Sequence, residues 1–301
     1  MELISKAYAK VNLHLQVLNR RIDGFHNIFS LNANIDIFDL LKLNIIDIFT
    51  NPNLEGLIKI IPDGGRHENV IHSISEKENL ISRSVELYLN RIGRKGRISV
   101  SIEKNIPAGA GFGGGSSDAA AILRLLNDYF QGIDESDLLK IGLELGADVP
   151  YCLTGGFAIC EGIGEKIEKI QGGLSNSVLF VNTGIHVDTR SAYLALGRTH
   201  KLPYNKEKLD DKRLIILEGI RNYNLDYIKP VLLNDFEKPV FEKYPEIRVI
   251  KEEIMSNNPD YVTMTGSGSS LIALFRDYHK AELSERSLRK IGREACITKF
   301  C

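Results

Sequence analysis

The feature that most constrains this chain is a glycine-rich stretch between residues 107 and 121. Its five glycines, which come just before two serines and an apolar run, are Gly109, Gly111, Gly113, Gly114 and Gly115. Glycine has no Cβ, so such a loop can adopt positive φ and bring its backbone close to a ligand. Residues 119–130 place apolar side chains at helical spacing, and Ser116 or Ser117 would serve as the N-cap. Backbone N–H groups gathered at the positive end of a helix predict an anion site, and phosphate is the usual anion.

Two well-known nucleotide patterns fit this stretch incompletely. A dinucleotide fingerprint, G-x-G-x-x-G, should follow a strand directly and be followed about 20 residues on by an acid that ends a second strand. Here residues 104–107 separate the strand-like residues 97–103 from the glycines, and the acids Asp134 and Glu135 precede another helix. The phosphate loop of the Walker type needs a lysine where this chain has Gly115. A plain surface turn that caps a helix rarely needs five glycines.

Composition excludes several classes of partner. The 301 residues are 43% hydrophobic and 26% charged, and the formal net charge is -1, which is ordinary for a soluble globular chain. The length favours about two domains. The chain has no excess of positive charge that would favour binding to nucleic acid or to an anionic membrane. No apolar run is long enough to cross a bilayer. We therefore expect a small-molecule partner, with no nucleic acid and no membrane.

The cysteines and the N-terminus favour a cytoplasmic location. The four cysteines form no C-x-x-C pair, so we interpret them as reduced thiols and not as a disulfide framework or a zinc site. The first six residues lack the apolar core of a secretion signal.

Three further segments contain residues with possible chemistry. Lys10 lies on the polar face of an alternating strand over residues 3–18, where periodicity alone favours a solvated lysine. Phe25 and His26 follow an Asp-Gly turn, and an aromatic ring beside a hydrogen-bonding side chain can stack on and read a flat base. Asp148 lies between a helix stop at Gly146 and Pro150, so its carboxylate is held in a fixed turn.

These segments resemble one group of enzymes. The stretch Pro-x-Gly-x-Gly-x-Gly-Gly-Gly-Ser-Ser-Asp-Ala-Ala from Pro107 resembles the phosphate loop of the small-molecule kinases of the GHMP superfamily. Residues 9–15, the run from Arg21 to His26 and the run from Gly146 to Pro150 are similar to segments of one family within it, whose members act on 4-diphosphocytidyl-2-C-methyl-D-erythritol. Phe25 stands where tyrosine is common, which keeps stacking but removes a hydroxyl. The resemblance implies ATP-dependent phosphorylation of the 2-hydroxyl of that substrate, in the non-mevalonate isoprenoid precursor pathway.

The resemblance also implies roles for individual residues. Asp148 would be the catalytic base, and Lys10 would polarise the hydroxyl and the γ-phosphoryl oxygen. ATP would be bound by the glycine loop and two residues before it: Pro107, Ala108, Gly109, Ala110, Gly111, Phe112, Gly113, Gly114, Gly115, Ser116, Ser117, Asn79 and Lys104. The substrate would be bound by Asn12, Phe25, His26, Thr189, Tyr193, Gly266 and Ser267. Two structural interpretations are equally good: Asn79 could instead be a helix N-cap, and Lys104 could instead be a surface lysine that does not bind nucleotide. Mg²⁺ would enter with ATP, although no acidic cage stands out and Asp118 is only a candidate neighbour.

The expected fold is α+β with two domains. The resemblance implies that residues 1–165 form an ATP-binding domain like the second domain of ribosomal protein S5 and that residues 166–301 form a ferredoxin-like domain. Along the chain we expect strands at 29–50, a hairpin and loop at 51–77, and a helix at 79–90. Further along the chain we expect a helix at 136–145 capped by Ser136 and a buried strand at 154–160. We also expect helices within 205–255 and a strand–loop–strand at 261–275.

Other functions stay open at this point. Another GHMP kinase, of the homoserine or mevalonate type, and a catalytically silent nucleotide-binding protein both fit the loop. A nicotinamide dehydrogenase is a more distant alternative. The chain would be a monomer or a weak homodimer.

Overall fold

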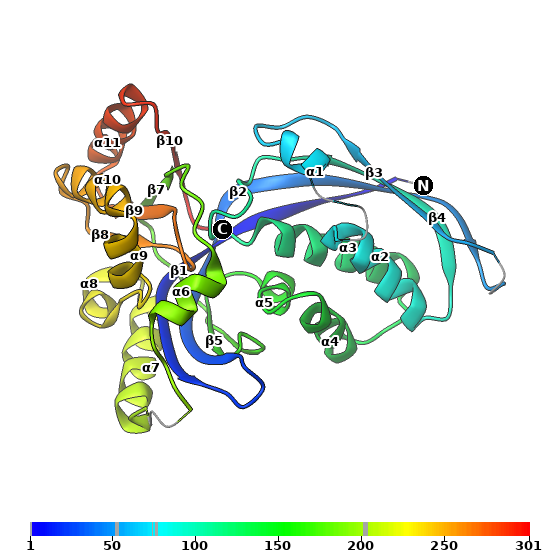
Figure 1. The fold of residues 1–301 in the computed structure, drawn as a ribbon, viewed down its shortest axis with the longest axis horizontal. Coiled ribbons are helices and arrows are strands. Elements are labelled where there is room, and N and C mark those ends of the chain that lie inside the picture. The colour runs from blue at the N-terminus through cyan, green and yellow to red at the C-terminus, as the bar shows by residue number, and fades with distance from the viewer. Residues whose placement is uncertain (1, 52–53, 74, 76–77, 201–203) are drawn as a thin grey trace. The chain divides into compact units, whose positions relative to one another are not determined.

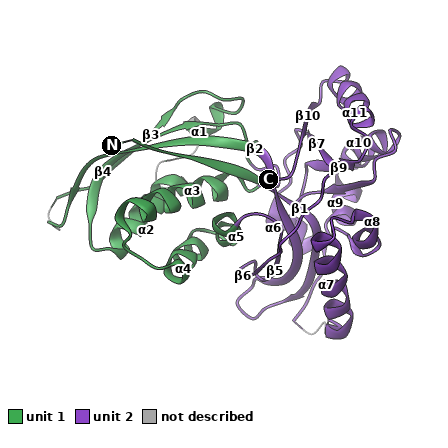
Figure 2. Cartoon of the chain, turned by 180° about the vertical axis from the view of Figure 1, so that it is seen from behind, with its two compact units in different colours: residues 1–9, 37–108, 113–154 green, residues 10–36, 109–112, 155–301 purple. Residues whose placement is uncertain are grey.

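A computed structural model describes residues 2–51, 54–73, 75, 78–200 and 204–301. Helices and strands are mixed throughout, which confirms the α+β expectation. The chain forms two compact units (Figure 2), and we treat each separately. Unit 1 comprises residues 1–9, 37–108 and 113–154, whereas unit 2 comprises residues 10–36, 109–112 and 155–301. The domain boundary expected at residue 165 stays a prediction.

Two long strands, β1 (Glu2–Arg20) and β2 (His26–Phe49), contribute residues to both units. The strand expected at 3–18 is confirmed, and the segment at 29–50 is one strand instead of several. From residue 9 to residue 15, side chains on both faces of β1 are buried. Lys10 is therefore not a solvated lysine, because its side of the strand is covered as well as the apolar side.

In unit 1, the carboxyl-terminal half of β2 pairs in antiparallel fashion with β4 (Lys95–Glu103), with Leu43 opposite Val100. β3 (Leu57–Pro62) pairs with β4 in parallel, so the hairpin expected within 51–77 is wrong. Parallel neighbours need a crossover connection. Here α1 (Asn69–Ser73) and α2 (Leu80–Arg91) lie in the connection between β3 and β4.

The other helices of unit 1 are α3 (Gly114–Phe130), α4 (Glu135–Leu145) and α5 (Val149–Thr154). Figure 1 shows α2, α3 and α4 gathered on one face of the strands. Their packing follows from apolar residues at helical spacing, such as Val85 and Tyr88 on α2 and Ile122 and Leu126 on α3, all of which are buried. The cap of α4 is Asp134, whose side chain accepts from the N–H of Asp137, and not Ser136.

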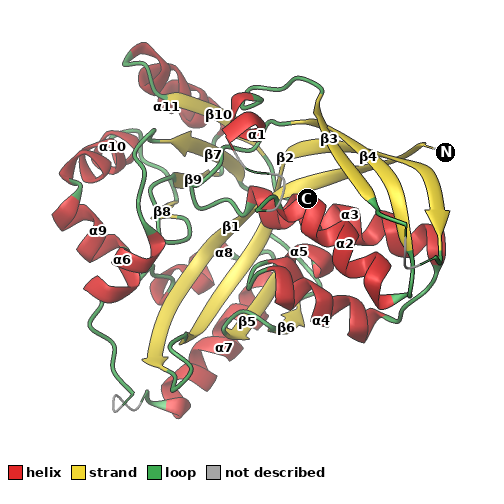
Figure 3. Cartoon of the chain, turned by 45° about the vertical axis from the view of Figure 1, so that its right-hand side comes forward, coloured by secondary structure: helices red, strands yellow, loops and turns green. Residues whose placement is uncertain are grey.

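In unit 2, four strands form an antiparallel sheet in the order β10-β7-β9-β8. They are β7 (Ser177–Asn182), β8 (Tyr261–Met264), β9 (Leu271–Phe275) and β10 (Glu294–Thr298). The helices of this unit are α6 (Thr189–Ala195), α7 (Lys206–Arg221), α8 (Leu225–Ile228), the 3₁₀ helix η1 (Lys229–Val231), α9 (Glu237–Lys243), α10 (Pro245–Met255) and α11 (Tyr278–Lys290). Figure 3 shows α9, α10 and α11 on one side of the strands. The chain order of strand, helices, two strands, helix and strand is ferredoxin-like, as expected.

Two shorter strands extend the first half of β2 within unit 2. β5 (Ala158–Gly162) pairs with β2, and β6 (Lys166–Lys169) pairs with β5. The strand expected at 154–160 begins only at Ala158, because Gly155 and Gly156 have φ of 66° and 73° and form a turn. Among the helices of the described residues, none is both long and apolar enough to cross a bilayer.

Candidate active site

The glycine loop adopts the backbone conformation for which glycine is needed. Gly109, Gly111 and Gly113 have φ of 65°, 88° and 64°, a region that other residues rarely adopt. Gly113 is itself the N-cap of α3, and it makes no side-chain capping bond. The expectation that Ser116 or Ser117 caps the helix is therefore wrong, because the left-handed Gly113 occupies the N-cap position three residues before Ser116. Ser117 instead donates its hydroxyl to the backbone carbonyl of Tyr8 at 2.7 Å.

This arrangement suits a phosphate. The first N–H groups of a helix have no partner within the helix, and they carry the positive end of its dipole. Since a glycine occupies the N-cap of α3, no side chain covers these groups from that position. Gly113, Gly114, Gly115 and Ser116 belong to unit 1, together with Pro107 and Ala108.

Two residues expected to bind nucleotide occupy defined positions in unit 1. Asn79 is the N-cap of α2, and its side-chain oxygen accepts from the N–H of Ile81 at 2.9 Å. Lys104 is buried, with its Nζ between the carboxylates of Asp39 and Asp118. It is therefore not a surface lysine. Burial lowers the pKa of Lys104, but the two carboxylates raise it more, so the ammonium stays charged.

Asp148 is half-buried in unit 1, in the turn before α5. Its backbone carbonyl accepts from the N–H of Cys152 at 3.0 Å, so the residue is held at the start of the helix. The expectation that a helix stop and a proline confine this aspartate agrees with the local structure, in which α4 ends before Gly146 and Pro150 lies in the first turn of α5.

In unit 2, Asn12 connects Lys10 with the second glycine loop. The Nζ of Lys10 donates to Oδ1 of Asn12 at 3.1 Å, and the N–H of Gly266 donates to the same oxygen at 2.9 Å. The Asn12 amide nitrogen donates to Oδ1 of Asn32 at 2.7 Å, and its backbone N–H donates to the Thr265 hydroxyl at 3.0 Å. Asn12, which was expected to bind the substrate, therefore links the side chain of Lys10 to the backbone of the loop at Gly266.

The two glycine loops touch backbone to backbone. A Cβ on Gly111 would overlap the carbonyl of Thr265, and a Cβ on Gly266 would lie 3.1 Å from Gly111 Cα. The N–H of Lys10 also donates to the carbonyl of Phe112 at 2.9 Å. These contacts form one packed group within unit 2. It contains residues 109–112, among them Ala110, together with Lys10 and the loop at 265–270.

Two of the residues expected to read a base, His26 and Tyr193, lie in ring contact. The rings of His26 and Tyr193 stack with centroids 4.9 Å apart and planes 27° apart. Phe25 is 56% exposed, and its N–H donates to Asp23 Oδ1 at 3.2 Å. Burial and the charge of Arg20 lower the pKa of His26, which favours the neutral ring that can both donate and accept a hydrogen bond.

Thr189 and Ser267 lie side by side in unit 2, with their hydroxyl oxygens 2.9 Å apart. Thr189 is the first residue of α6, and Ser267 lies in the loop between β8 and β9. The structure thus brings together Lys10, Asn12 and Gly266 as one set and His26 with Tyr193 as another. Lys104 and Asp148 belong to the other unit.

Comparison with known proteins defines the family. Residues 79–156 match the family model for the GHMP kinases N terminal domain, and residues 216–294 match that for the GHMP kinases C terminal. A 4-diphosphocytidyl-2-C-methyl-D-erythritol kinase of Clostridium kluyveri is 34% identical over 298 residues, which cover 99% of each chain. An enzyme of the same name from Caldicellulosiruptor bescii is 33% identical and covers 98% of this chain and 97% of its own. The chain belongs to this family of GHMP kinases.

Solved structures of GHMP kinases agree with this assignment. A crystal structure of 4-(cytidine 5'-diphospho)-2C-methyl-D-erythritol kinase has a TM-score of 0.75 and 29% identity, and covers 99% of each chain. Homoserine kinase from Cytophaga hutchinsonii has a TM-score of 0.74 at 18% identity, covering 99% of this chain and 94% of its own. The second likeness shows the fold alone.

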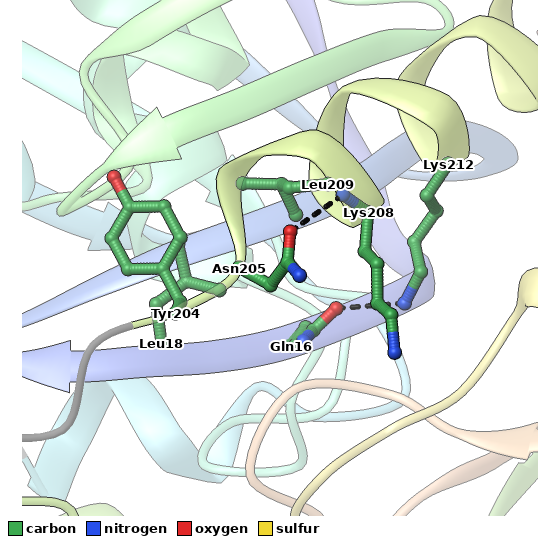
Figure 4. Close-up of a pocket in the computed structure, with 7 residues that line it drawn as sticks. All are labelled: Gln16, Leu18, Tyr204, Asn205, Lys208, Leu209 and Lys212. Atoms are coloured by element: carbon green, nitrogen blue, oxygen red, sulfur yellow. Dashed lines mark hydrogen bonds between the residues drawn. The ribbon is translucent and has the colours of Figure 1, made fainter.

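A pocket of about 230 Å³ lies between β1 and the start of α7 in this GHMP kinase (Figure 4). It is lined by Gln16, Leu18, Tyr204, Asn205, Lys208, Leu209 and Lys212. Lys212 reaches across it and donates to the side-chain oxygen of Gln16 at 2.7 Å. None of the predicted site residues lines this pocket.

Sequence reasoning missed two residues that shape the site of this GHMP kinase. Asp39 binds both Lys104 and the backbone just before the glycine loop, and Asn32 holds the amide of Asn12. Each lies on β2, far in sequence from the residue that it holds. The Asn and Asp residues of β2 were the available signal, because polar side chains inside a buried strand need a partner.

Proposed function

We propose that this GHMP kinase transfers the γ-phosphoryl group of ATP to the 2-hydroxyl of 4-diphosphocytidyl-2-C-methyl-D-erythritol, giving the 2-phosphate and ADP. This reaction belongs to the non-mevalonate isoprenoid precursor pathway. The observation that carries the proposal is similarity over the full chain to kinases named for this substrate. The Asp-Gly-Phe-His turn, which ends at His26 beside Tyr193, supports the choice of a cytidylyl substrate.

In this proposal the glycine loop binds the phosphates of ATP. The residues involved are Pro107, Ala108, Gly109, Ala110, Gly111, Phe112, Gly113, Gly114, Gly115, Ser116 and Ser117, with Asn79 and Lys104 in the nucleotide-binding set. Support comes from the alternating positive φ of the loop and from the N-terminus of α3, where backbone N–H groups can meet an anion.

Mg²⁺ would enter with ATP and neutralise charge on the transferring phosphoryl group. Across the described residues, no group of three or more His, Cys, Asp or Glu side chains is arranged to hold a metal ion. Asp118 does not suit the task, because it is buried and one of its oxygens accepts from Lys104. Phosphate oxygens and water would therefore supply most ligands, as is usual for this ion.

Asp148 would orient and deprotonate the 2-hydroxyl, and Lys10 would stabilise charge on the hydroxyl and phosphoryl oxygens. Phosphoryl transfer depends mainly on positioning and electrostatic stabilisation. The turn before α5 restrains Asp148, and Asn12 restrains Lys10. Both side chains are thus attached to local structure that limits their movement.

The substrate would be held by Asn12, Phe25, His26, Thr189, Tyr193, Gly266 and Ser267. The exposed ring of Phe25 and the stacked pair of His26 and Tyr193 offer flat surfaces for cytosine. The hydroxyls of Thr189 and Ser267 and the loop at Gly266 offer donors for the diphosphate. We also propose cytoplasmic action as a monomer or weak homodimer, with no nucleic acid or membrane partner, in keeping with a net charge of -1.

Release of ADP from MgATP tests the activity directly. The assay compares 4-diphosphocytidyl-2-C-methyl-D-erythritol with homoserine and mevalonate as acceptors. We expect turnover with the cytidylyl acceptor alone. Turnover with either control, or with no acceptor of the three, would contradict the substrate assignment.

A further inference from the structure

Asp39, Lys104 and Asp118 form a buried ionic cluster in unit 1. Lys104 Nζ donates to Oδ2 of Asp118 at 2.6 Å and to Oδ2 of Asp39. The three side chains are 5%, 0% and 5% exposed for Lys104, Asp39 and Asp118. Each comes from a different place: Asp39 from β2, Lys104 from the residue after β4, and Asp118 from α3.

The cluster connects the two ends of the glycine loop. On the incoming side, Asp39 Oδ1 accepts from the backbone N–H of Asn105 at 2.5 Å and of Ile106 at 2.8 Å. These residues directly precede Pro107. On the outgoing side, Asp118 lies in α3, which begins as the loop ends. Lys104 bridges the two carboxylates and so links the incoming strand to the outgoing helix.

The packing leaves little room for the ends to move. A Cβ on Gly114, the first residue of α3, would lie 3.0 Å from Ile106 Cγ2 and 3.2 Å from Lys104 Nζ. The backbone of Lys104 is held as well, since its N–H donates to the carbonyl of Gly64 and its carbonyl accepts from the N–H of His67, both at 2.9 Å. A displacement of Lys104 would therefore change the packing at Gly114, the first residue of α3.

The charge of the cluster is compatible with a neighbouring phosphate. Burial raises the pKa of Asp118, and the Asp39 carboxylate adds to this, while Lys104 opposes it. A proton held on Asp118 leaves one cation and one anion, so the cluster has no net charge that would repel phosphate oxygens. Within the described part of the chain, Asp118 Oδ1 is buried with no hydrogen-bond partner, which disfavours the charged carboxylate and agrees with the raised pKa of Asp118.

We propose that Asp39, Lys104 and Asp118 are positioning residues that fix the two ends of the phosphate loop, and that Lys104 acts on nucleotide affinity through loop position. The inference rests on the proposed phosphate-binding role of the loop, but it does not depend on the identity of the phosphoryl acceptor. For Lys104 it replaces the direct contact with ATP given under the proposed function by a role in holding the loop.

A double-mutant cycle on nucleotide affinity tests this proposal. The Kd of MgADP is measured by calorimetry for the intact chain, Lys104→Met, Asp118→Leu and the double variant, with folding checked by circular dichroism. We expect each single change to weaken binding about tenfold. The double change should weaken it by about the same factor, because both substitutions break the same link between the ends of the loop. A product of the two factors, about a hundredfold, would mean that Lys104 binds the nucleotide independently, and would overturn the proposal.

Asp118→Asn serves as the conservative rescue. Asparagine resembles a protonated carboxyl and keeps an oxygen for Lys104, so we expect its Kd for MgADP to stay within about threefold of the original, which is below 1 kcal/mol. If Lys104→Met does not fold, the difference in the Kd of MgADP between Asp118→Asn and Asp118→Leu still tests the positioning role. Equal affinity in these two folded variants would refute the positioning role.

Lys42→Met is the matched control. Lys42 also lies on β2 and pairs with Asp63 at 2.6 Å, but that ion pair is partly exposed and lies outside the cluster. We expect unchanged affinity for MgADP. Because the assay needs no acceptor, failure of the substrate assignment would leave this test intact. Failure of the intact chain to bind MgADP would overturn both the phosphate loop and this inference.

Discussion

Lys10 and Asp148 differ in how firmly the chain holds them. Lys10 is 4% exposed and donates to Asn12, which in turn accepts from the N–H of Gly266. Asp148 is half-buried in a turn, and its backbone leads directly into α5. A carboxylate that remains accessible can meet a substrate hydroxyl, whereas a buried lysine held by an amide supplies a fixed charge.

Asp148→Asn tests the proposed base. Asparagine keeps the size of the side chain but cannot accept the proton, so we expect kcat to fall about 10²- to 10⁴-fold, or roughly 3–5 kcal/mol, with MgADP affinity retained. Steady-state ADP release and calorimetry measure the two quantities. Asp128→Asn, an exposed change on α3, is the control and should keep full activity. Turnover near the original rate in Asp148→Asn would rule out the base assignment.

Among the elements, the glycine loop shows what sequence reasoning can and cannot provide. The conformation of the loop was predictable, because its glycines allow the positive φ that Gly109, Gly111 and Gly113 adopt, whereas the anion site itself stays a prediction. The N-cap was mistaken because Gly113 takes a left-handed conformation and starts α3 before the serines. The burial of Lys104 was not predictable, since Asp39 lies 65 residues away in sequence and no local pattern joins the two.

The other element-scale difference concerns β3. The turn-rich residues around β3 favoured a hairpin, but the pairing direction of a strand is decided by the route of the chain. The chain passes through α1 and α2 before it returns as β4, and this route gives a parallel pair. In contrast, the ferredoxin-like order of unit 2 was implied by the family resemblance, and the structure confirms it in the sheet order β10-β7-β9-β8.

Gly111→Ala tests the close approach of the two glycine loops. The φ of 88° disfavours a side chain, and its Cβ would overlap the Thr265 carbonyl, so we expect a loss of about 2–3 kcal/mol in the free energy of unfolding. Urea denaturation measures the loss. Gly115→Ala is the control, because a Cβ there meets only Leu80 Cδ1, at 3.5 Å. Equal stability of the two variants would show that the loops do not pack as described.

At the scale of the whole molecule, a buried histidine connects stability with pH. His14 on β1 is fully buried, and its Nδ1 accepts from the N–H of Leu233 at 3.1 Å. Burial, aided by the charge of Lys212 and opposed by Gln16, lowers the pKa of His14 from 6.5 to about 3. The ring is therefore neutral in the folded chain at neutral pH.

The pH dependence of unfolding follows from this shift. The unfolded chain protonates His14 below pH 6.5 but the folded chain does not, so stability is intact above that pH and falls as the pH drops toward 3. Between pH 7 and pH 5 the loss from this residue is about 2 kcal/mol. His14→Asn keeps an acceptor for Leu233 and cannot titrate, so its unfolding free energy should change less over this range. An identical pH slope in the two proteins, measured by urea denaturation, would exclude His14 as the source.

The stretch from β3 to His67 has a consequence for how the length of this chain can vary. It is an edge of the sheet in unit 1, and its carbonyl and N–H groups at Gly64 and His67 grip the backbone of Lys104. A Cβ on Gly65 would overlap that same backbone. Because these contacts hold Lys104, three residues before Pro107, we expect a residue inserted or deleted within 57–67 to displace the glycine loop, so this stretch helps to support that loop.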